Sequence, residues 1–255
     1  MKAICLLGIK PNQIWIEFLN KFKNYDIYIM IDDSKDYTEK FKEYKNVKIL
    51  QVPDKVCEKK HFSKTTSFCV RKRITSWDRA LYYFSTLNKK HKYVWFIEED
   101  VFFNSEKTLA DIDKKYPTSD LLSSITKDKE HSKEWYHWNR FEINLPEPHY
   151  KCMCCAVRMS QAMLSKIKQY VKENKQSCFL EAFFPTLCIS NNLKHDTPKE
   201  LDDIVYRKEY TLGEINKTNL FHPFKDAILH TLLRNTLKVS KINNKTRKIK
   251  NLILC

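Results

Sequence analysis

Glycine is almost missing from this sequence, which has only Gly8 and Gly213 among its 255 residues. The Walker P-loop and the GxGxxG loop of dinucleotide-binding folds both need several glycines, because their backbone approaches the phosphates closely. The sequence therefore excludes both loops. It also has no glycine- and serine-rich linker and no internal repeat, so a single folded domain is the simplest organisation.

Long apolar runs are also lacking. No stretch approaches the roughly 20 apolar residues that cross a bilayer, and Met1–Gly8 is too short for a signal peptide. We therefore expect a cytoplasmic protein with neither a signal peptide nor a transmembrane segment.

The cysteines form no regular pattern. They number 9, which is odd, and a core built from 255 residues needs no disulfide bonds. Reduced thiols are therefore expected. The run Cys-Met-Cys-Cys at 152–155 could suggest zinc, but no second CxxC or HxxxH pair follows it. A buried strand with small sulfur side chains is the better interpretation.

The composition is that of a folded and strongly basic protein. Hydrophobic residues make up 42% and aromatic residues 13% of the chain, which argues against disorder. The net charge of +15 favours an anionic partner: a nucleotide, a phosphorylated sugar, nucleic acid or a membrane surface. Residues 231–255 contain lysines and arginines but no acid. This basic C-terminal tail is either solvated or in weak contact with an anionic membrane.

Apolar runs alternate with amphipathic segments in the first part of the chain. Strands are expected at Lys2–Ile9, Tyr25–Ile31 and Val47–Val52. A helix with one buried face is expected after Pro11, and a short polar helix over Ser34–Tyr44. This order predicts an α/β fold, a single Rossmann-like domain whose mostly parallel central sheet is flanked by helices.

The later part of the chain is less regular. A capping box begins a helix at Thr75–Asp78, and strands are expected at Asp120–Ile125 and Cys152–Met159. Residues 126–150 form a long polar segment that carries several aromatic side chains, and loops of this length are usually functional or disordered. These aromatic rings either stack on sugars or bases, or fold as a flap onto the core.

One stretch combines a core strand with clustered charge. The apolar run Tyr93–Ile97 is followed at once by Glu98, Glu99 and Asp100, and a second apolar run closes behind them. Carboxylates are costly to desolvate and to crowd together. A divalent cation would relieve both costs, and ligands collect at the carboxyl ends of strands in open α/β sheets. The alternative is an ordinary acidic turn after a core strand.

Three segments together resemble the nucleotide-sugar glycosyltransferases of the GT-A fold. The stretch Tyr93–Phe103 is similar to their DxD segment, although its first acid is glutamate. Glu181 resembles the acid at a helix start that serves as base in inverting members. Phe221–Lys225 resembles the C-terminal segment whose histidine completes the metal site. The resemblance covers Lys2 to Lys225 within a domain of residues 1–230. The sequence also resembles virus-encoded members of similar length and the same segment order, and a viral protein would act in the host cytoplasm.

The resemblance implies a metal site and a base. Asp100 and His222 would bind Mn²⁺, or Mg²⁺, directly, and Glu98 would help through water or the ribose. Lys225 would meet the diphosphate. Glu181 would take the proton from the acceptor hydroxyl. His222 could instead be a core histidine, and Glu181 an ordinary acid of a first helical turn.

The resemblance also implies a nucleotide site. Its expected members lie at the ends of the first strands, on the helix before the acidic triplet and in the triplet itself. They are Lys10, Asp32, Asp33, Asp78, Arg79, Glu98 and Glu99, of which Glu99 has no firm role. The capping box already accounts for Asp78, and a helix-capping turn could account for Asp32 and Asp33.

The function expected from these residues is metal-dependent transfer of a hexose or deoxyhexose. The donor would be a nucleotide sugar, with UDP as the expected carrier, the acceptor a glycan or another hydroxyl compound, and the mechanism inverting. A metal-dependent nuclease would also suit clustered carboxylates and positive charge. A catalytically inactive domain that binds glycans or nucleic acid is the third possibility. Under the leading interpretation no stable nucleic-acid partner is expected.

Overall fold

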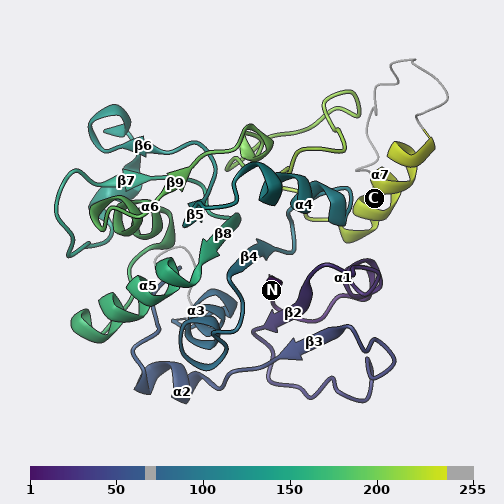
Figure 1. Ribbon diagram of the computed structural model, residues 1–255, viewed down its shortest axis with the longest axis horizontal. Helices are drawn as coiled ribbons and strands as arrows, with labels where there is room; N and C mark the ends of the chain where they lie inside the picture. The colour runs from purple at the N-terminus through teal and green to yellow at the C-terminus, as the bar shows by residue number, and fades with distance from the viewer. Residues whose placement is uncertain (67–72, 240–255) are drawn as a thin grey trace.

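The computed structural model describes residues 1–66 and 73–239 (Figure 1). Within these ranges the main sheet has seven strands in the order β3-β2-β1-β4-β8-β5-β9. Strand β8 runs antiparallel to both of its neighbours, and the other strand pairs of the sheet are parallel. The strands are β1 (Lys2–Gly8), β2 (Asp26–Ile31), β3 (Val47–Leu50), β4 (Tyr93–Glu98), β5 (Leu121–Leu122), β8 (Ala156–Ser160) and β9 (His195–Asp196). The predicted α/β fold with a mostly parallel central sheet is confirmed.

Helices cover both faces of this sheet (Figure 1). Alternate residues of β1 point to opposite sides: Cys5 lies in a core that α3, α5 and α6 complete, and Leu6 lies in a core that α1 and α4 complete. Both cores are buried, which is why β1, β2 and β4 are apolar without a break. The helices are α1 (Gln13–Leu19), α2 (Asp54–Lys59), α3 (Ser76–Tyr82), α4 (Glu106–Lys115), α5 (Gln161–Asn174), α6 (Leu180–Ser190) and α7 (Ala227–Val239).

The strand order reverses between β1 and β4. From β1 the chain moves outward to β2 and β3, and β4 then returns to the other side of β1. At such a switch point the loops that leave neighbouring strands turn in opposite directions, and a crevice opens at the carboxyl ends of the strands. Gly8 ends β1 and Glu98 ends β4, and the acidic triplet therefore begins at this crevice.

A buried ion pair ties the sheet to α4. The Asp113 carboxylate accepts from Arg158 Nη1 at 2.8 Å, from Tyr25 Oη at 2.7 Å and from Trp95 Nε1 at 3.1 Å. Lys2 Nζ lies 2.9 Å from the same carboxylate. The side chains of Asp113 and Arg158 are both fully buried. Four elements therefore share one charge-compensated centre.

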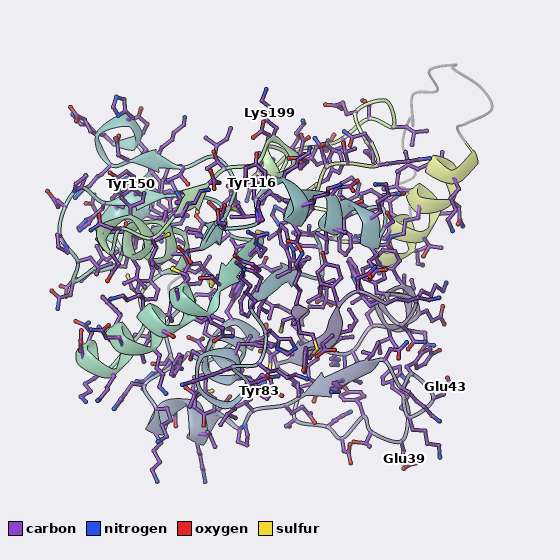
Figure 2. The ribbon with its side chains drawn as sticks, in the orientation of Figure 1. Glu39, Glu43, Tyr83, Tyr116, Tyr150 and Lys199 are labelled. Carbon is purple, nitrogen blue, oxygen red and sulfur yellow. The ribbon has the colours of Figure 1, made fainter. Side chains whose placement is uncertain are left out.

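The predicted helix over Ser34–Tyr44 is wrong. This segment consists of turns, and Glu39 and Glu43 project from it at the edge of the molecule (Figure 2). The Asp33 carboxylate accepts from the backbone N–H of Lys35 at 2.9 Å, and Asp36 accepts from that of Thr38 at 2.8 Å. Aspartates that bond to the backbone two residues later compete with helix formation.

Two predicted strands are shorter than expected. Only Leu121–Leu122 of the segment Asp120–Ile125 is a strand, and β8 begins at Ala156 instead of Cys152. The Ser124 side chain bonds to both the backbone N–H and the carbonyl of Met153 at 3.0 Å. Because the Ser124 side chain bonds to the backbone groups of Met153, these groups do not form strand-to-strand hydrogen bonds, and the segment before β8 is not a strand.

The aromatic segment 126–150 folds onto the core. Its ends pair as β6 (Lys127–Asp128) with β7 (Tyr150–Lys151). Trp135 stacks on Phe179 with ring centroids 6.0 Å apart, and Trp138 is buried. The structure therefore has the flap arrangement, and the flap rests on the residue that precedes α6.

Helix α7 closes the described part of the chain. His230 is fully buried and its Nε2 donates to the Phe224 carbonyl at 2.8 Å, while Arg234 Nε donates to the Phe103 carbonyl at 3.2 Å. Residues 231–239 of the predicted basic tail thus belong to this helix, and 240–255 lie outside the described residues. None of the described helices is both long and apolar enough to cross a membrane. The cysteines of the described ranges are all free and buried.

Candidate active site

A cavity of about 790 Å³ opens at the carboxyl ends of the first strands. It is lined by residues that directly follow β1 and β2, by residues of β4, α3 and α6, and by the segment after β9. Eight of the residues singled out from the sequence line it, namely Lys10, Asp32, Asp33, Glu98, Asp100, Glu181, His222 and Lys225. Asp78, Arg79 and Glu99 do not. The volume is large enough for a ligand of nucleotide size.

Glu98 is fixed at the end of β4. Its backbone N–H donates to the Cys155 carbonyl at 2.8 Å, which continues the pairing with β8 beyond the ladder. Its side chain accepts from Trp77 Nε1 at 2.6 Å. Burial, and then the negative charge of Asp100, raise the pKa of Glu98 above its ordinary value. A cation beside this carboxylate would therefore offset the cost of keeping it ionised.

Asp100 and His222 are brought together by backbone bonds. Phe102 pairs with Phe221 in an antiparallel bridge, and the Phe224 N–H donates to the Asp100 carbonyl at 2.7 Å. These bonds place His222 Nε2 3.4 Å from Asp100 Oδ2. Burial lowers the pKa of His222, but the hydrogen bond and charge of Asp100 outweigh it and the pKa is raised.

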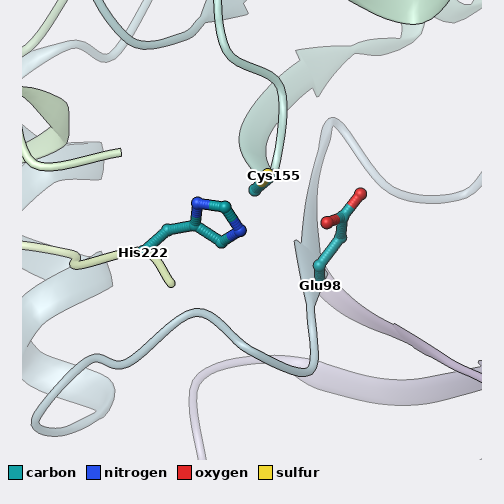
Figure 3. A group of neighbouring side chains, drawn as sticks. All are labelled: Glu98, Cys155 and His222. Carbon is teal, nitrogen blue, oxygen red and sulfur yellow. The ribbon is translucent and has the colours of Figure 1, made fainter. Parts of the chain in front are cut away.

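The orientation of the His222 ring suits a metal ligand. Its Nδ1 donates to the Val205 carbonyl at 2.6 Å, so Nε2 is the nitrogen that faces the acids. Ligand atoms of Glu98, Cys155 and His222 lie within 4.8 Å of one another (Figure 3). The three side chains come from β4, the residue before β8 and the C-terminal segment, and they turn toward a common space. A divalent cation fits this donor set, which combines carboxylates with an oriented imidazole.

Glu181 faces the same cavity from the first turn of α6. In the described ranges its carboxyl group makes no hydrogen bond or ion pair, while its backbone carbonyl accepts from the Cys152 N–H at 2.9 Å. Burial and the charge of Glu98 raise the pKa of Glu181 to about 7, against the opposing charges of Lys151 and His222. A carboxyl group with this pKa can accept and release a proton near neutral pH.

Glu99 turns away from the cavity. Its carboxylate accepts from the backbone N–H of Ile9 and lies over Gly8, where a Cβ would be 2.8 Å from Glu99 Oε2. Its carbonyl accepts from Trp15 Nε1 at 2.9 Å. A side chain at position 8 would therefore meet the end of the Glu99 side chain, which would have to move.

Asp78 and Arg79 lie behind the cavity wall. Asp78 is fully buried and completes the capping box of α3, accepting from the Thr75 N–H at 3.0 Å and from the Thr65 N–H at 3.1 Å. Arg79 Nη1 donates to the Ile31 carbonyl, and the same nitrogen lies 3.8 Å from Asp32 Oδ1. Arg79 therefore holds the end of β2, including Asp32, instead of lining the cavity.

Asp33 reaches the cavity but its carboxylate also builds a turn. It accepts from the Lys35 N–H at 2.9 Å and from Tyr37 Oη at 2.7 Å, and the Lys35 bond is the main reason that its pKa is lowered. Lys10 and Lys225 are exposed at the rim. The Asp33 carboxylate thus stabilises a turn at the edge of the cavity, but this turn does not begin a helix.

Sequence reasoning missed several lining residues. Trp77 and Cys155 face the triplet, and the exposed pair Tyr206 and Arg207 lies at the rim, with the guanidinium carbon 4.9 Å from the tyrosine ring centroid. Cys155 is opposite Glu98 only because β8 pairs with β4. The segment that carries Tyr206 has no periodicity that marks it. The only sequence feature that could indicate a binding role for this segment is the adjacent pair of aromatic and basic residues itself.

The switch point, the reversed strand β8 and the acidic end of β4 define a GT-A-type fold. No protein-family model and no curated protein matches the sequence, but solved structures do. The galactosyltransferase LgtC, in complex with donor and acceptor sugar analogues, is 10% identical with a TM-score of 0.51, covering 94% of this chain and 97% of that chain. An active-site mutant of LgtC is 10% identical with a TM-score of 0.50, covering 92% and 96%.

A third structure is less similar. Core-mannan synthase A from Aspergillus fumigatus, in its Mn/GDP form, is 12% identical with a TM-score of 0.37, covering 76% of this chain and 72% of that chain. The two LgtC structures span nearly the whole chain. The chain therefore has the GT-A fold, as the sequence resemblance predicted. The resemblance to virus-encoded members stays a prediction.

Proposed function

We propose that this protein is a metal-dependent glycosyltransferase that uses a nucleotide sugar, with UDP as the carrier. One observation carries the proposal: Glu98, Asp100, Glu181 and His222 converge in a single cavity at the switch point of a GT-A fold. A donor sugar nucleotide and an acceptor both have to reach such a centre, and the cavity volume of about 790 Å³ allows it.

The donor diphosphate would lie against the basic rim. Lys225 and Arg207 are exposed at the mouth of the cavity, and Tyr206 offers an exposed ring beside them. Guanidinium and ammonium groups bind phosphate oxygens, and an aromatic ring can stack on a base. Asp32 and Lys10, at the ends of β2 and β1, would meet the nucleoside. In this arrangement the nucleotide would lie across the crevice between β1 and β4.

Asp100 and His222 would hold a divalent cation, Mn²⁺ or Mg²⁺, with Glu98 beside them. When bound, such an ion acts as a Lewis acid that stabilises the charge on the leaving diphosphate. The Val205 carbonyl keeps the His222 ring in the tautomer whose Nε2 can bind. The Trp77 indole N–H donates to Glu98 Oε1 and holds this carboxylate in place. These contacts orient the ligands before the donor arrives.

Glu181 would act as the base. Its carboxyl group is free of protein hydrogen bonds in the described ranges, and its pKa of about 7 suits transfer of the acceptor proton to a carboxylate oxygen. Attack by the deprotonated hydroxyl on the face opposite the diphosphate inverts the anomeric carbon. The acceptor would therefore approach from the side of α6 and the flap 126–150.

A panel of nucleotide sugars, incubated with Mn²⁺, Mg²⁺ or EDTA, tests this function. Metal-dependent release of a nucleoside diphosphate from one donor is the expected result, faster when a hydroxyl acceptor is present. Release of nucleoside monophosphate would show attack at phosphorus instead of carbon. Cleavage of nucleic acid without any sugar release would favour the nuclease alternative and overturn the proposal.

A further inference from the structure

Cys155 lies in the active-site cavity although no role has been given to it. It directly precedes β8, and its carbonyl accepts from the Glu98 N–H at 2.8 Å. The residue is 6% exposed and lines the cavity. The other cysteines of the described ranges do not line this cavity. Its position therefore follows from the pairing of β8 with β4.

The sulfur belongs to a convergent donor group. Sγ of Cys155, a Glu98 carboxylate oxygen and a His222 ring nitrogen lie within 4.8 Å of one another (Figure 3). Ligands on opposite sides of one ion, each about 2.0–2.3 Å from it, are roughly 4–4.6 Å apart. One ion can therefore contact all three after small side-chain adjustments. Asp100 Oδ2, 3.4 Å from His222 Nε2, can reach the same ion.

We infer that Cys155 is a direct ligand of the divalent cation and binds it as a thiolate. The inference rests on the metal site of the proposed function. On binding, the sulfur–metal bond forms, the S–H bond breaks and the proton leaves to solvent, without any change of oxidation state. The site then offers carboxylate, imidazole and thiolate donors. Such a set binds Zn²⁺, Co²⁺ or Cd²⁺ more tightly than an oxygen-only set does, and gains less with Mg²⁺.

A competing arrangement is present in the structure itself. The Cys155 thiol is placed to donate a hydrogen bond to the Glu98 carboxylate, and in that case it would only support an oxygen ligand. The two arrangements differ in one observable. A thiolate bound to Co²⁺ gives an intense sulfur-to-metal charge-transfer band in the near ultraviolet, and a thiol bonded to a carboxylate gives none.

The experiment titrates the metal-free full-length protein with Co²⁺ and records its absorption spectrum. The charge-transfer band should appear with the weaker visible bands of bound Co²⁺, should disappear in Cys155→Ser and Cys155→Ala, and should remain in Cys57→Ala. Cys57 is a matched control because it is buried in α2, away from the cavity. In addition, Cd²⁺ affinity measured by calorimetry should fall at least tenfold in Cys155→Ser, while Mg²⁺ affinity changes little.

Three results would overturn the inference. They are binding of Co²⁺ by the wild-type protein without the sulfur band, persistence of the band in both Cys155 variants, and failure to bind Co²⁺ at all. The wild-type spectrum keeps the test decisive even if a variant does not fold. Nucleotide-sugar hydrolysis is measured separately. Hydrolysis without the sulfur band would show that Cys155 is not a ligand and would leave the proposed glycosyltransferase function standing. A sulfur band without hydrolysis of any donor would support Cys155 as a ligand and count against the proposed function.

Discussion

His222 Nε2 lies 3.4 Å from Asp100 Oδ2, and the Nδ1 of the same ring donates to the Val205 carbonyl. The contact joins the acidic loop after β4 to a segment that follows the last strand of the sheet. The Phe102–Phe221 bridge and the Phe224–Asp100 backbone bond fix this approach from both sides. The pair is therefore built by the backbone and does not depend on a chance meeting of two side chains.

Replacing Asp100 should remove cation binding. In Asp100→Asn the amide keeps the shape but loses the charge, and we expect Mn²⁺ binding in calorimetry to be abolished and transfer to fall about 10²–10³-fold, the usual loss when one stabilising group is removed. Asp202→Asn, at an exposed position outside the cavity, should leave both unchanged. Full Mn²⁺ affinity in Asp100→Asn would contradict the assignment.

The transfer rate should depend on pH through Glu181. Because burial raises the pKa of this carboxyl group to about 7, the base is mostly protonated below that pH, and the rate should fall about tenfold per pH unit on the acid side. Glu181→Gln should retain donor binding and lose about 10²–10⁴-fold in transfer above pH 7, and its residual rate should lack this acid limb. Equal activity of the variant and the wild type would remove Glu181 from the reaction.

Lys151 should set the position of that pH profile. It is half-buried on β7, with its Nζ 5.2 Å from the Trp135 ring centroid, and its positive charge lowers the pKa of Glu181. Lys151→Met removes the charge and keeps the apolar stem, so the acid limb of the kcat/KM profile should move to higher pH. Lys151→Arg should leave the limb in place. A shift to lower pH in the methionine variant would contradict the electrostatic coupling.

The fold should depend strongly on Asp113. Asp113→Ala leaves the fully buried Arg158 guanidinium without its counter-charge, and breaking a buried pair costs about 3–5 kcal/mol. Asp111→Ala, on the same helix, breaks only the exposed pair with Lys107 and should cost about 1 kcal/mol or less. Urea denaturation of both variants measures the difference. Equal losses would mean that the buried pair contributes no more than a surface one.

The parallel half of the fold is predictable from sequence because its strands are buried on both faces. Lys2–Gly8 and Tyr93–Glu98 read as apolar runs, and they occupy the centre of the sheet. The pattern of Ser34–Tyr44 predicts a helix, but the Asp33 and Asp36 side chains bond to nearby backbone groups instead, and this competition leaves no trace in the hydrophobic periodicity. The local hydrogen bonds of these aspartates therefore determine the structure of this segment, and the hydrophobic pattern does not reveal them.

Site residues that are neighbours in one segment can be predicted from the sequence. Residues that come together only through the pairing of distant strands cannot. Glu98 and Asp100 stand out because carboxylates rarely follow a core strand in a cluster. Cys155 could not be found, since its place opposite Glu98 depends on the antiparallel pairing of β8 with β4. Arg79 shows the opposite case. Its place on the helix before the acidic triplet suggested a nucleotide contact, but its guanidinium donates to the Ile31 carbonyl and to Asp54.

Thermal denaturation with UDP and Mn²⁺, alone and together, tests most directly whether a nucleoside diphosphate and a cation share this cavity. Together they should stabilise the protein by about 2.7 kcal/mol at a ligand concentration 100-fold above Kd. UDP with EDTA should give a much smaller shift, and Asp100→Asn should lose the metal-dependent part. If no nucleoside diphosphate raises Tm in a way that requires Mn²⁺ or Mg²⁺, the account of this site is wrong.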